Sequence, residues 1–168
     1  YALKMGVDCI FVIETPLEVE LIVDTARKLG IRPKIGARVR LASCASGHWQ
    51  DSGGDRSVFG LNTSQLIDCV DHLRRAGMLD CLELLHYHLG SQIPDIRDVR
   101  TSLDEACRVY LGLIEEGAPL GMFDIGGGLA IDYDGSQSSS SSSRNYSISE
   151  YCIDVVEIIK AHMDEARV

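Results

Sequence analysis

The sequence CLELLHYHLGSQ, residues 81–92, joins an apolar run to a polar end. The apolar half indicates a buried strand, which we expect to continue as far as His88. Because strand side chains alternate between faces, His86 and His88 share one face and Tyr87 takes the other. Gly90 and Ser91 then allow a tight turn out of the strand, and they supply backbone N–H groups and a hydroxyl. The stretch therefore predicts a buried strand whose carboxyl end opens into a functional site.

A second predicted strand, residues 121–125, ends in the three glycines Gly126, Gly127 and Gly128. The triplet does not match the GxGxxG fingerprint of dinucleotide-binding proteins. Consecutive glycine N–H groups can cradle a phosphate, and a tight turn is an equally good interpretation. Asp124 alternates with Ile125, which predicts either a carboxylate that faces the site or a structural one.

Strands and helices alternate along the whole chain. This order predicts an α/β fold whose parallel strands are joined by right-handed crossovers. It fits an open doubly wound sheet or about half of a (β/α)8 barrel, since a complete barrel needs about 250 residues. In both architectures the site lies at the carboxyl ends of the strands. The expected strands are residues 9–13, 34–41, 81–88 and 121–125, and the expected helices follow the capping residues Thr15, Asn62, Asp95 and Ser147.

Apolar residues at helical spacing predict which helix faces are buried. The first helix is expected to bury Leu17, Leu21, Ile22, Ala26 and Leu29, and the last helix Cys152, Val155, Val156 and Ile159. Two segments lack such spacing. The loop of residues 42–60 is predicted to be packed down by Trp49. The serine tract of residues 138–143 is predicted to be a mobile loop tip, because serine cannot bury apolar surface.

Composition limits the class of protein. The chain has 168 residues, enough for one domain, and we expect an internal fragment because it begins at Tyr1 and ends inside a helical pattern. The formal net charge of −9 argues against nucleic acid or an anionic membrane as partner and is compatible with a cationic substrate. No apolar run has the length of a membrane span. Six cysteines without a CxxC pair predict buried free thiols in a reducing compartment.

The histidines allow more than one chemistry. His86 and His88 on one face form a possible metal pair, which suggests a metal-dependent hydrolase. His88 also fits a flat ring held against a planar cofactor, with Ser91 near the phosphate of that cofactor, or a core histidine satisfied by a neighbour. Ser91 could instead be a nucleophile, but it does not stand in the GxSxG motif that surrounds the nucleophilic serine of α/β-hydrolases. No third metal ligand is evident, because the other histidines lie in loop or helix contexts: His48, His72 and His162.

Five stretches together resemble a known family: RVRLAS (38–43), GHWQDSGG (47–54), FGL (59–61), LLHYHLGSQ (84–92) and FDIGGGLAIDYD (123–134). The chain is similar over essentially its whole length to the pyridoxal-phosphate decarboxylases with an alanine-racemase-like barrel. Within them it resembles the biosynthetic arginine decarboxylases, and its serine-rich insertion looks like the plant type. The resemblance implies that residues 1–168 are part of a pyridoxal-phosphate-binding barrel domain of the (β/α)8 class, with about four βα units.

The resemblance also implies an activity. It is the decarboxylation of L-arginine to agmatine and CO2 in the biosynthesis of putrescine and spermidine, with pyridoxal 5'-phosphate as cofactor and Mg²⁺ possible in the family. The implied partner is a second copy of the chain, in a homo-oligomer whose subunits share sites. The implied compartment is the cytoplasm or a plastid. A metal-dependent hydrolase and a catalytically inactive decarboxylase-like partner protein stay as alternatives.

The resemblance assigns roles to single residues. His88 matches the histidine that stacks on the pyridine ring, and Ser91 matches a phosphate contact. Gly126, Gly127 and Gly128 match the phosphate loop, which Asp124 precedes as a further cofactor-binding candidate. The resemblance places the lysine that anchors the cofactor on an upstream strand, and the lysines of this chain do not stand in its motif: Lys4, Lys28, Lys34 and Lys160. The carboxylate that holds the ring nitrogen and the C-terminal β domain are expected beyond Val168, and Val58 stands where the family has a lysine.

Overall fold

The fold was obtained as a computed structural model, which describes residues 1–43 and 58–166. The chain divides into two compact units. Unit 1 comprises Tyr1–Arg40, Phe59–Tyr87 and Gly112–Asp124, and unit 2 comprises Leu41–Val58, His88–Leu111 and Ile125–Val168. The predicted role of Trp49 in packing the long loop lies outside the described residues.

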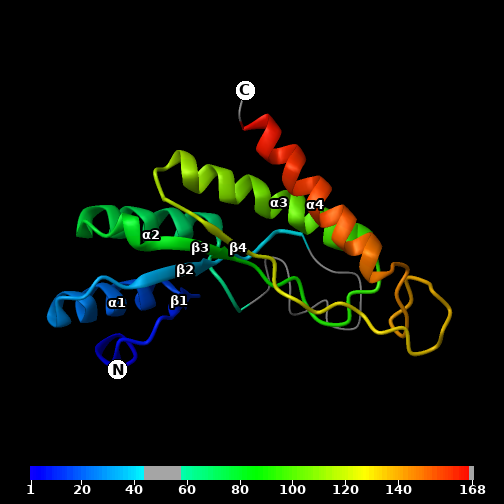
Figure 1. The fold of residues 1–168 in the computed structure, drawn as a ribbon, viewed down its shortest axis with the longest axis horizontal. Helices are drawn as coiled ribbons and strands as arrows, with labels where there is room; N and C mark the ends of the chain where they lie inside the picture. Colours follow the sequence, from blue (N-terminus) through cyan, green and yellow to red (C-terminus); the bar gives the residue numbers. More distant parts are fainter. Residues whose placement is uncertain (44–57, 167–168) are drawn as a thin grey trace. The chain divides into compact units, whose positions relative to one another are not determined.

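Unit 1 contains a four-stranded parallel sheet with the strand order β1-β2-β3-β4 (Figure 1). A doubly wound sheet reverses its strand order at a switch point, whereas the strands of a (β/α)8 barrel follow one another around the sheet. The consecutive order therefore matches the barrel, and helices α1 and α2, which follow β1 and β2, pack against each other. The bounds are β1 Ile10–Ile13, α1 Pro16–Leu29, β2 Lys34–Arg38, α2 Thr63–Ala76, β3 Leu82–His86 and β4 Met122–Asp124.

The capping residues predicted from the sequence set the ends of the unit 1 helices. At α1, Glu18 Oε2 accepts a hydrogen bond of 2.9 Å from the backbone N–H of Thr15, and Gly30 ends the helix with a φ of 64°. At α2, Asn62 Oδ1 accepts from the Gln65 N–H at 2.9 Å, and Gln65 Oε1 accepts from the Asn62 N–H at 3.0 Å. These bonds satisfy N–H groups that a helix start leaves without partners.

The buried face of α1 differs from the one predicted. Its buried residues are Val19, Val23 and Ala26, whereas Leu17 and Leu21 are 61% and 57% exposed. The prediction is confirmed for Ala26 and is wrong for Leu17 and Leu21, because the helix carries apolar residues on more than one side and spacing alone permits two stripes. Packing against the rest of unit 1 selects the stripe of smaller side chains.

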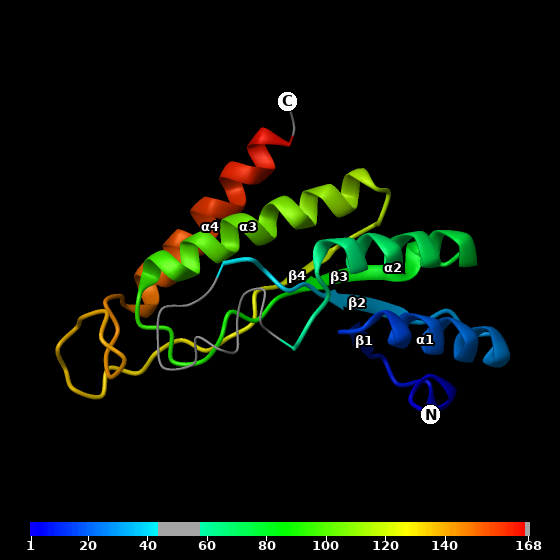
Figure 2. The same cartoon turned by 180° about the vertical axis from the view of Figure 1, so that it is seen from behind.

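Unit 2 contains helix α4 (Ile148–Glu165) and most of helix α3 (Ile96–Glu115), which lie side by side in both ribbon views (Figures 1 and 2). Asp104 of α3 lies 2.8 Å from the ring nitrogen Nε2 of His162 on α4. Asp95 caps α3 by accepting from the Arg97 N–H at 3.0 Å, and this hydrogen bond lowers the pKa of the Asp95 carboxyl. The contact of Asp104 with His162 thus joins the two helices.

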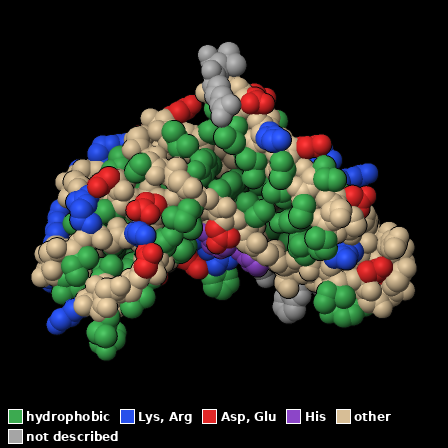
Figure 3. Space-filling model, viewed as in Figure 1, with side chains coloured by type: hydrophobic (Ala, Val, Ile, Leu, Met, Phe, Trp, Pro, Cys, Tyr) green, Lys and Arg blue, Asp and Glu red, His purple; other side chains and the backbone are tan. Residues whose placement is uncertain are grey.

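Helix α4 has no buried residue in this chain. Cys152 and Val156, which the spacing predicted to be buried, are exposed. Figure 3 shows hydrophobic side chains on the surface of the molecule. The prediction of buried thiols is confirmed for Cys69, Cys81 and Cys107, and it is wrong for Cys152. Cys9 is half-buried, and Cys44 lies outside the described residues. Burial raises the pKa of Cys69 and of Cys107 to about 11.

Hydrogen bonds hold the last residue of the serine tract, Ser143, in place. Ser143 is fully buried, and its Oγ donates a 2.6 Å hydrogen bond to Asp132 Oδ1 and accepts one of 3.0 Å from the Ser138 N–H. The mobility of the tract stays a prediction, but its last residue has a defined, buried position. Within residues 1–43 and 58–166, no helix combines the length and the apolar character needed to cross a membrane.

Candidate cofactor-binding site

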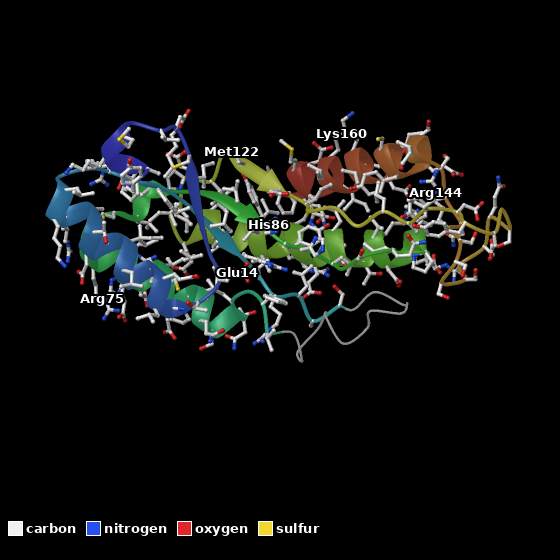
Figure 4. The ribbon with its side chains drawn as sticks, turned by 90° about the horizontal axis from the view of Figure 1, so that it is seen from below. Glu14, Arg75, His86, Met122, Arg144 and Lys160 are labelled. Carbon is white, nitrogen blue, oxygen red and sulfur yellow. The ribbon has the colours of Figure 1, made fainter. Side chains whose placement is uncertain are left out.

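Charged side chains line the carboxyl ends of the four strands in unit 1. Arg38 of β2 stands opposite His86 of β3, which stands opposite Asp124 of β4, and Glu14 follows β1 directly. Arg38 Nη1 lies 2.9 Å from Glu14 Oε1, and His86 Nδ1 lies 3.0 Å from Asp124 Oδ2. Figure 4 shows Glu14 and His86 at the ends of their strands. One ion pair and one histidine–carboxylate contact thus occupy the edge of the sheet where the site was predicted.

The two histidines of the opening stretch have different surroundings. Strand β3 ends at His86, so the alternation that was predicted to place His88 on the same face does not extend to it. The Nδ1 atom of His86 faces the Asp124 carboxylate, while His88 is exposed. In the described part of the chain, no group of three His, Cys, Asp or Glu side chains could hold a metal ion. This geometry gives no support to the metal-dependent hydrolase.

Asp124 is positioned by its strand and by His86. Its side chain is 52% exposed, and its backbone oxygen accepts a 3.1 Å hydrogen bond from the Tyr87 N–H. The sequence left open whether this carboxylate faces a ligand or serves structure, and the pairing with His86 shows a structural contact. The role of Asp124 toward a cofactor stays a prediction.

In unit 2, the segment after His88 and the glycine triplet touch each other. A Cβ atom added at Gly128 would lie 1.8 Å from the carbonyl oxygen of Gly90 and 3.2 Å from the Cα of Ser91. Only glycine permits this approach, and its φ of +89° also favours glycine. The structure therefore brings the Ser91 turn and the triplet together, as a common phosphate site requires.

The residues present fit a phosphate group. At Gly127 a Cβ atom would meet nothing within 4 Å, so an anion can approach the backbone there. Ser91 is exposed beside Gly128, and Gly126 has a φ of +68°, so that the triplet curves where a strand would run straight. Curved glycine backbone with an adjacent hydroxyl is the kind of concavity that binds phosphate. The geometry accommodates the phosphate end of pyridoxal phosphate.

Sequence reasoning missed four residues, two in each unit. Glu14 and Arg38 pair at strand ends, and the rule that sites lie at carboxyl ends, applied to all four strands, would have found them. Gln92 and Tyr146 hydrogen-bond to the two phosphate-site segments in unit 2. Their hydrogen-bond partners lie far away in the sequence, so no local sequence pattern indicates the role of Gln92 or Tyr146.

Comparison with known proteins defines the class. Residues 1–167 match the family model of the pyridoxal-dependent decarboxylases, pyridoxal binding domain. The chain belongs to this family, which agrees with its four parallel βα units.

Particular relatives are biosynthetic arginine decarboxylases. That of Marinobacter nauticus is 50% identical over 161 residues, which are 96% of this chain and 25% of the relative. That of Shewanella sediminis is 49% identical over 156 residues, 93% of this chain and 24% of the relative. The chain thus spans about a quarter of the length of the curated relatives it matches.

Solved structures of the same class have the same fold. The crystal structure of the biosynthetic arginine decarboxylase from Campylobacter jejuni matches with a TM-score of 0.81 and 34% identity, covering 98% of this chain and 26% of that one. Diaminopimelate decarboxylase from Helicobacter pylori, complexed with L-lysine, matches with a TM-score of 0.79 and 20% identity, covering 95% of this chain and 38% of that one. The second likeness concerns the fold alone. Together they confirm the prediction of a partial barrel.

Proposed function

We propose that the full-length protein containing this chain decarboxylates L-arginine to agmatine and CO2 with pyridoxal 5'-phosphate, as a step toward putrescine and spermidine. The observation that carries the proposal is the 50% identity, over nearly the whole chain, to a biosynthetic arginine decarboxylase. The juxtaposition of Gly128 with Gly90 and Ser91 supports it independently, because it forms a cradle of the kind a phosphorylated cofactor needs.

In this proposal, residues 1–168 form part of the barrel domain that holds the cofactor. When bound, pyridoxal phosphate supplies an electron sink for the carbon–carbon bond that breaks. His88 would stack on the pyridine ring and would exclude water from that side. The Ser91 hydroxyl and the N–H groups of residues 126–128 donate hydrogen bonds to the phosphate. Asp124 takes part in binding the cofactor from the end of β4.

The strand-end charges bear on the substrate. The net charge of −9 favours the approach of a cationic substrate such as arginine. Arg38 carries a positive charge at the sheet edge, but Glu14, 2.9 Å away, compensates it. This pairing offsets the Arg38 charge, which would otherwise repel a guanidinium group.

The assembly and the compartment complete the proposal. The active form is a homo-oligomer in which subunits share sites, in the cytoplasm or in a plastid, and Mg²⁺ is a candidate additional ion. Sedimentation of the full-length protein tests the assembly. A monomer with full activity would contradict shared sites.

The decisive experiment uses the purified full-length protein. With pyridoxal phosphate, it is expected to release CO2 from L-arginine and to form agmatine in equal amounts, with much lower rates on L-ornithine, L-lysine and diaminopimelate. Preference for one of these other amino acids would refute the substrate, and absence of any turnover would favour the inactive partner protein. The 168-residue chain alone is expected to be inactive, because none of its lysines stands in the anchor motif, and agmatine formation by it would contradict this expectation.

A further inference from the structure

The two segments that form the phosphate cradle have little regular structure of their own. Residues 90–93 and residues 126–131 follow strands β3 and β4, and one isolated parallel bridge, Ile93 with Leu129, joins them as sheet. Through it the Ile93 N–H donates a 3.0 Å hydrogen bond to the carbonyl oxygen of Gly128. A single isolated bridge is a short pairing for two segments that must present several N–H groups to one anion. Side-chain contacts between the segments therefore help to hold the cradle in register.

Gln92 supplies the first of these contacts. Its Nε2 donates a 2.8 Å hydrogen bond to the carbonyl oxygen of Ile131, and its Oε1 accepts one of 3.0 Å from the Ile131 N–H. The side-chain amide thus takes the place of a backbone peptide group and pairs with Ile131 as a neighbouring strand would. Gln92 has a φ of +54°, a conformation that non-glycine residues seldom adopt, and the two hydrogen bonds offset the strain of this turn beside Ser91.

Tyr146 supplies the second contact. Its hydroxyl donates a 2.8 Å hydrogen bond to the carbonyl oxygen of Ile93 and accepts one of 3.3 Å from the N–H of Ala130. Tyr146 is 5% exposed, and Ile93 and Ala130 are buried as well, so water has little access to replace either bond. A single buried hydroxyl thus joins the segment after Ser91 to the segment after the glycine triplet.

We propose that Gln92 and Tyr146 are positioning residues that hold the two halves of the phosphate cradle in register for a phosphorylated cofactor. The inference rests on the proposed function, since it takes the bound group to be pyridoxal phosphate. Neither side chain needs to touch the cofactor. Each sets where the Ser91 hydroxyl and the glycine N–H groups lie, and hydrogen bonds to an anion weaken steeply when their geometry shifts.

The test uses Gln92→Met and Tyr146→Phe in the full-length apoprotein, because both changes keep the shape and remove the hydrogen bonds. Exposed residues of the same unit, Gln137 and Tyr133, provide the matched controls Gln137→Met and Tyr133→Phe. Equilibrium binding is measured with pyridoxal 5'-phosphate and with pyridoxal, which lacks the phosphate. Circular dichroism of each apoprotein verifies the fold.

Each cradle variant is expected to bind pyridoxal phosphate roughly tenfold more weakly and pyridoxal within about twofold of the unsubstituted protein, while both controls bind both ligands normally. The double variant is expected to lose less than the product of the single effects, because both residues act on one pairing. Equal losses for the two ligands, or unchanged affinity for pyridoxal phosphate, would overturn the positioning role alone. An unsubstituted protein that does not bind pyridoxal phosphate would overturn the proposed function and this inference together.

Discussion

Replacing Gly128 by alanine tests the cradle most directly. Alanine at a φ of +89° is strained by about 1–2 kcal/mol before any contact is considered. Its Cβ would lie 1.8 Å from the Gly90 carbonyl oxygen, and because contacts below 3.0 Å are essentially never seen, the two segments must separate. The separation breaks the hydrogen bond from the Ile93 N–H to Gly128, which is worth about 1 kcal/mol. Together these effects amount to about 3 kcal/mol, or about 100-fold in an equilibrium constant.

The assay is the dissociation constant for pyridoxal phosphate of the full-length protein, measured by titration of the apoprotein. We expect Gly128→Ala to raise it about 100-fold, since a misplacement near 1 Å at a binding constellation has effects of about this size. Gly112→Ala is the matched control, because Gly112 lies within helix α3 and not in the cradle and its Cβ would meet nothing within 4 Å, and we expect a change of no more than about threefold. Equal effects of the two substitutions, or unchanged affinity in Gly128→Ala, would refute the reasoning.

Three further predictions concern other parts of the chain. His88→Ala is expected to weaken pyridoxal phosphate binding about tenfold through loss of ring contact, and unchanged affinity and turnover would count against stacking. Ser143→Ala is expected to lower the free energy of unfolding by about 1–3 kcal/mol, because it removes the buried hydroxyl that donates to the Asp132 carboxylate. Ser141 is exposed, so Ser141→Ala is expected to change little, and thermal denaturation of the two variants tests this difference. The thiols of Cys69 and Cys107 have pKa values raised from 9.0 to about 11, so their contribution to stability is complete below pH 9 and lost as the pH rises through 11. Denaturation between pH 8 and pH 11 should show a decline that flattens when both are replaced by alanine, and an unchanged slope would contradict the assignment.

The order of elements was predictable from the sequence because its signals are local. Thr15, Asn62 and Ser147 each begin a helix with a capping box, and the hydrogen bonds involved span only three residues. Strand ends were less accurate. Strand β3 ends at His86, two residues before the predicted end, because backbone pairing with the neighbouring strands decides where a strand stops.

The buried faces were predictable only where the apolar residues form one stripe. In α2 the apolar residues Leu66, Val70 and Leu73 are buried, with Cys69 beside them, whereas Ile67, which has the same spacing, is 40% exposed. In α1 and α4 the apolar residues extend around the helix, so the buried side depends on neighbours that a helical spacing does not specify.

The rule that sites lie at the carboxyl ends of parallel strands predicted which two segments form the candidate site. It did not predict the residues that hold these segments in place. It predicted that Ser91 and the glycine triplet would meet, and Gly128 does lie against Gly90 and Ser91. It gave no indication of Gln92 or Tyr146, whose hydrogen-bond partners are 39 and 53 residues away in the chain. Such supports depend on the tertiary structure, and a polar residue next to a motif does not reveal its partner.

The contact of Tyr146 with Ala130 has a consequence for how the protein tolerates change in length. The hydrogen bond from the Ala130 N–H to the Tyr146 hydroxyl brings together the two ends of the serine-rich loop of residues 131–145. This loop, here called the serine-rich excursion, is therefore closed where it leaves the cradle. Doubling the length of such a closed excursion costs only about 0.6 kcal/mol of chain entropy. Residues inserted beyond the base therefore leave the neighbouring glycines undisturbed, and the tip of this excursion is the natural place to graft a foreign peptide or a fluorescent label.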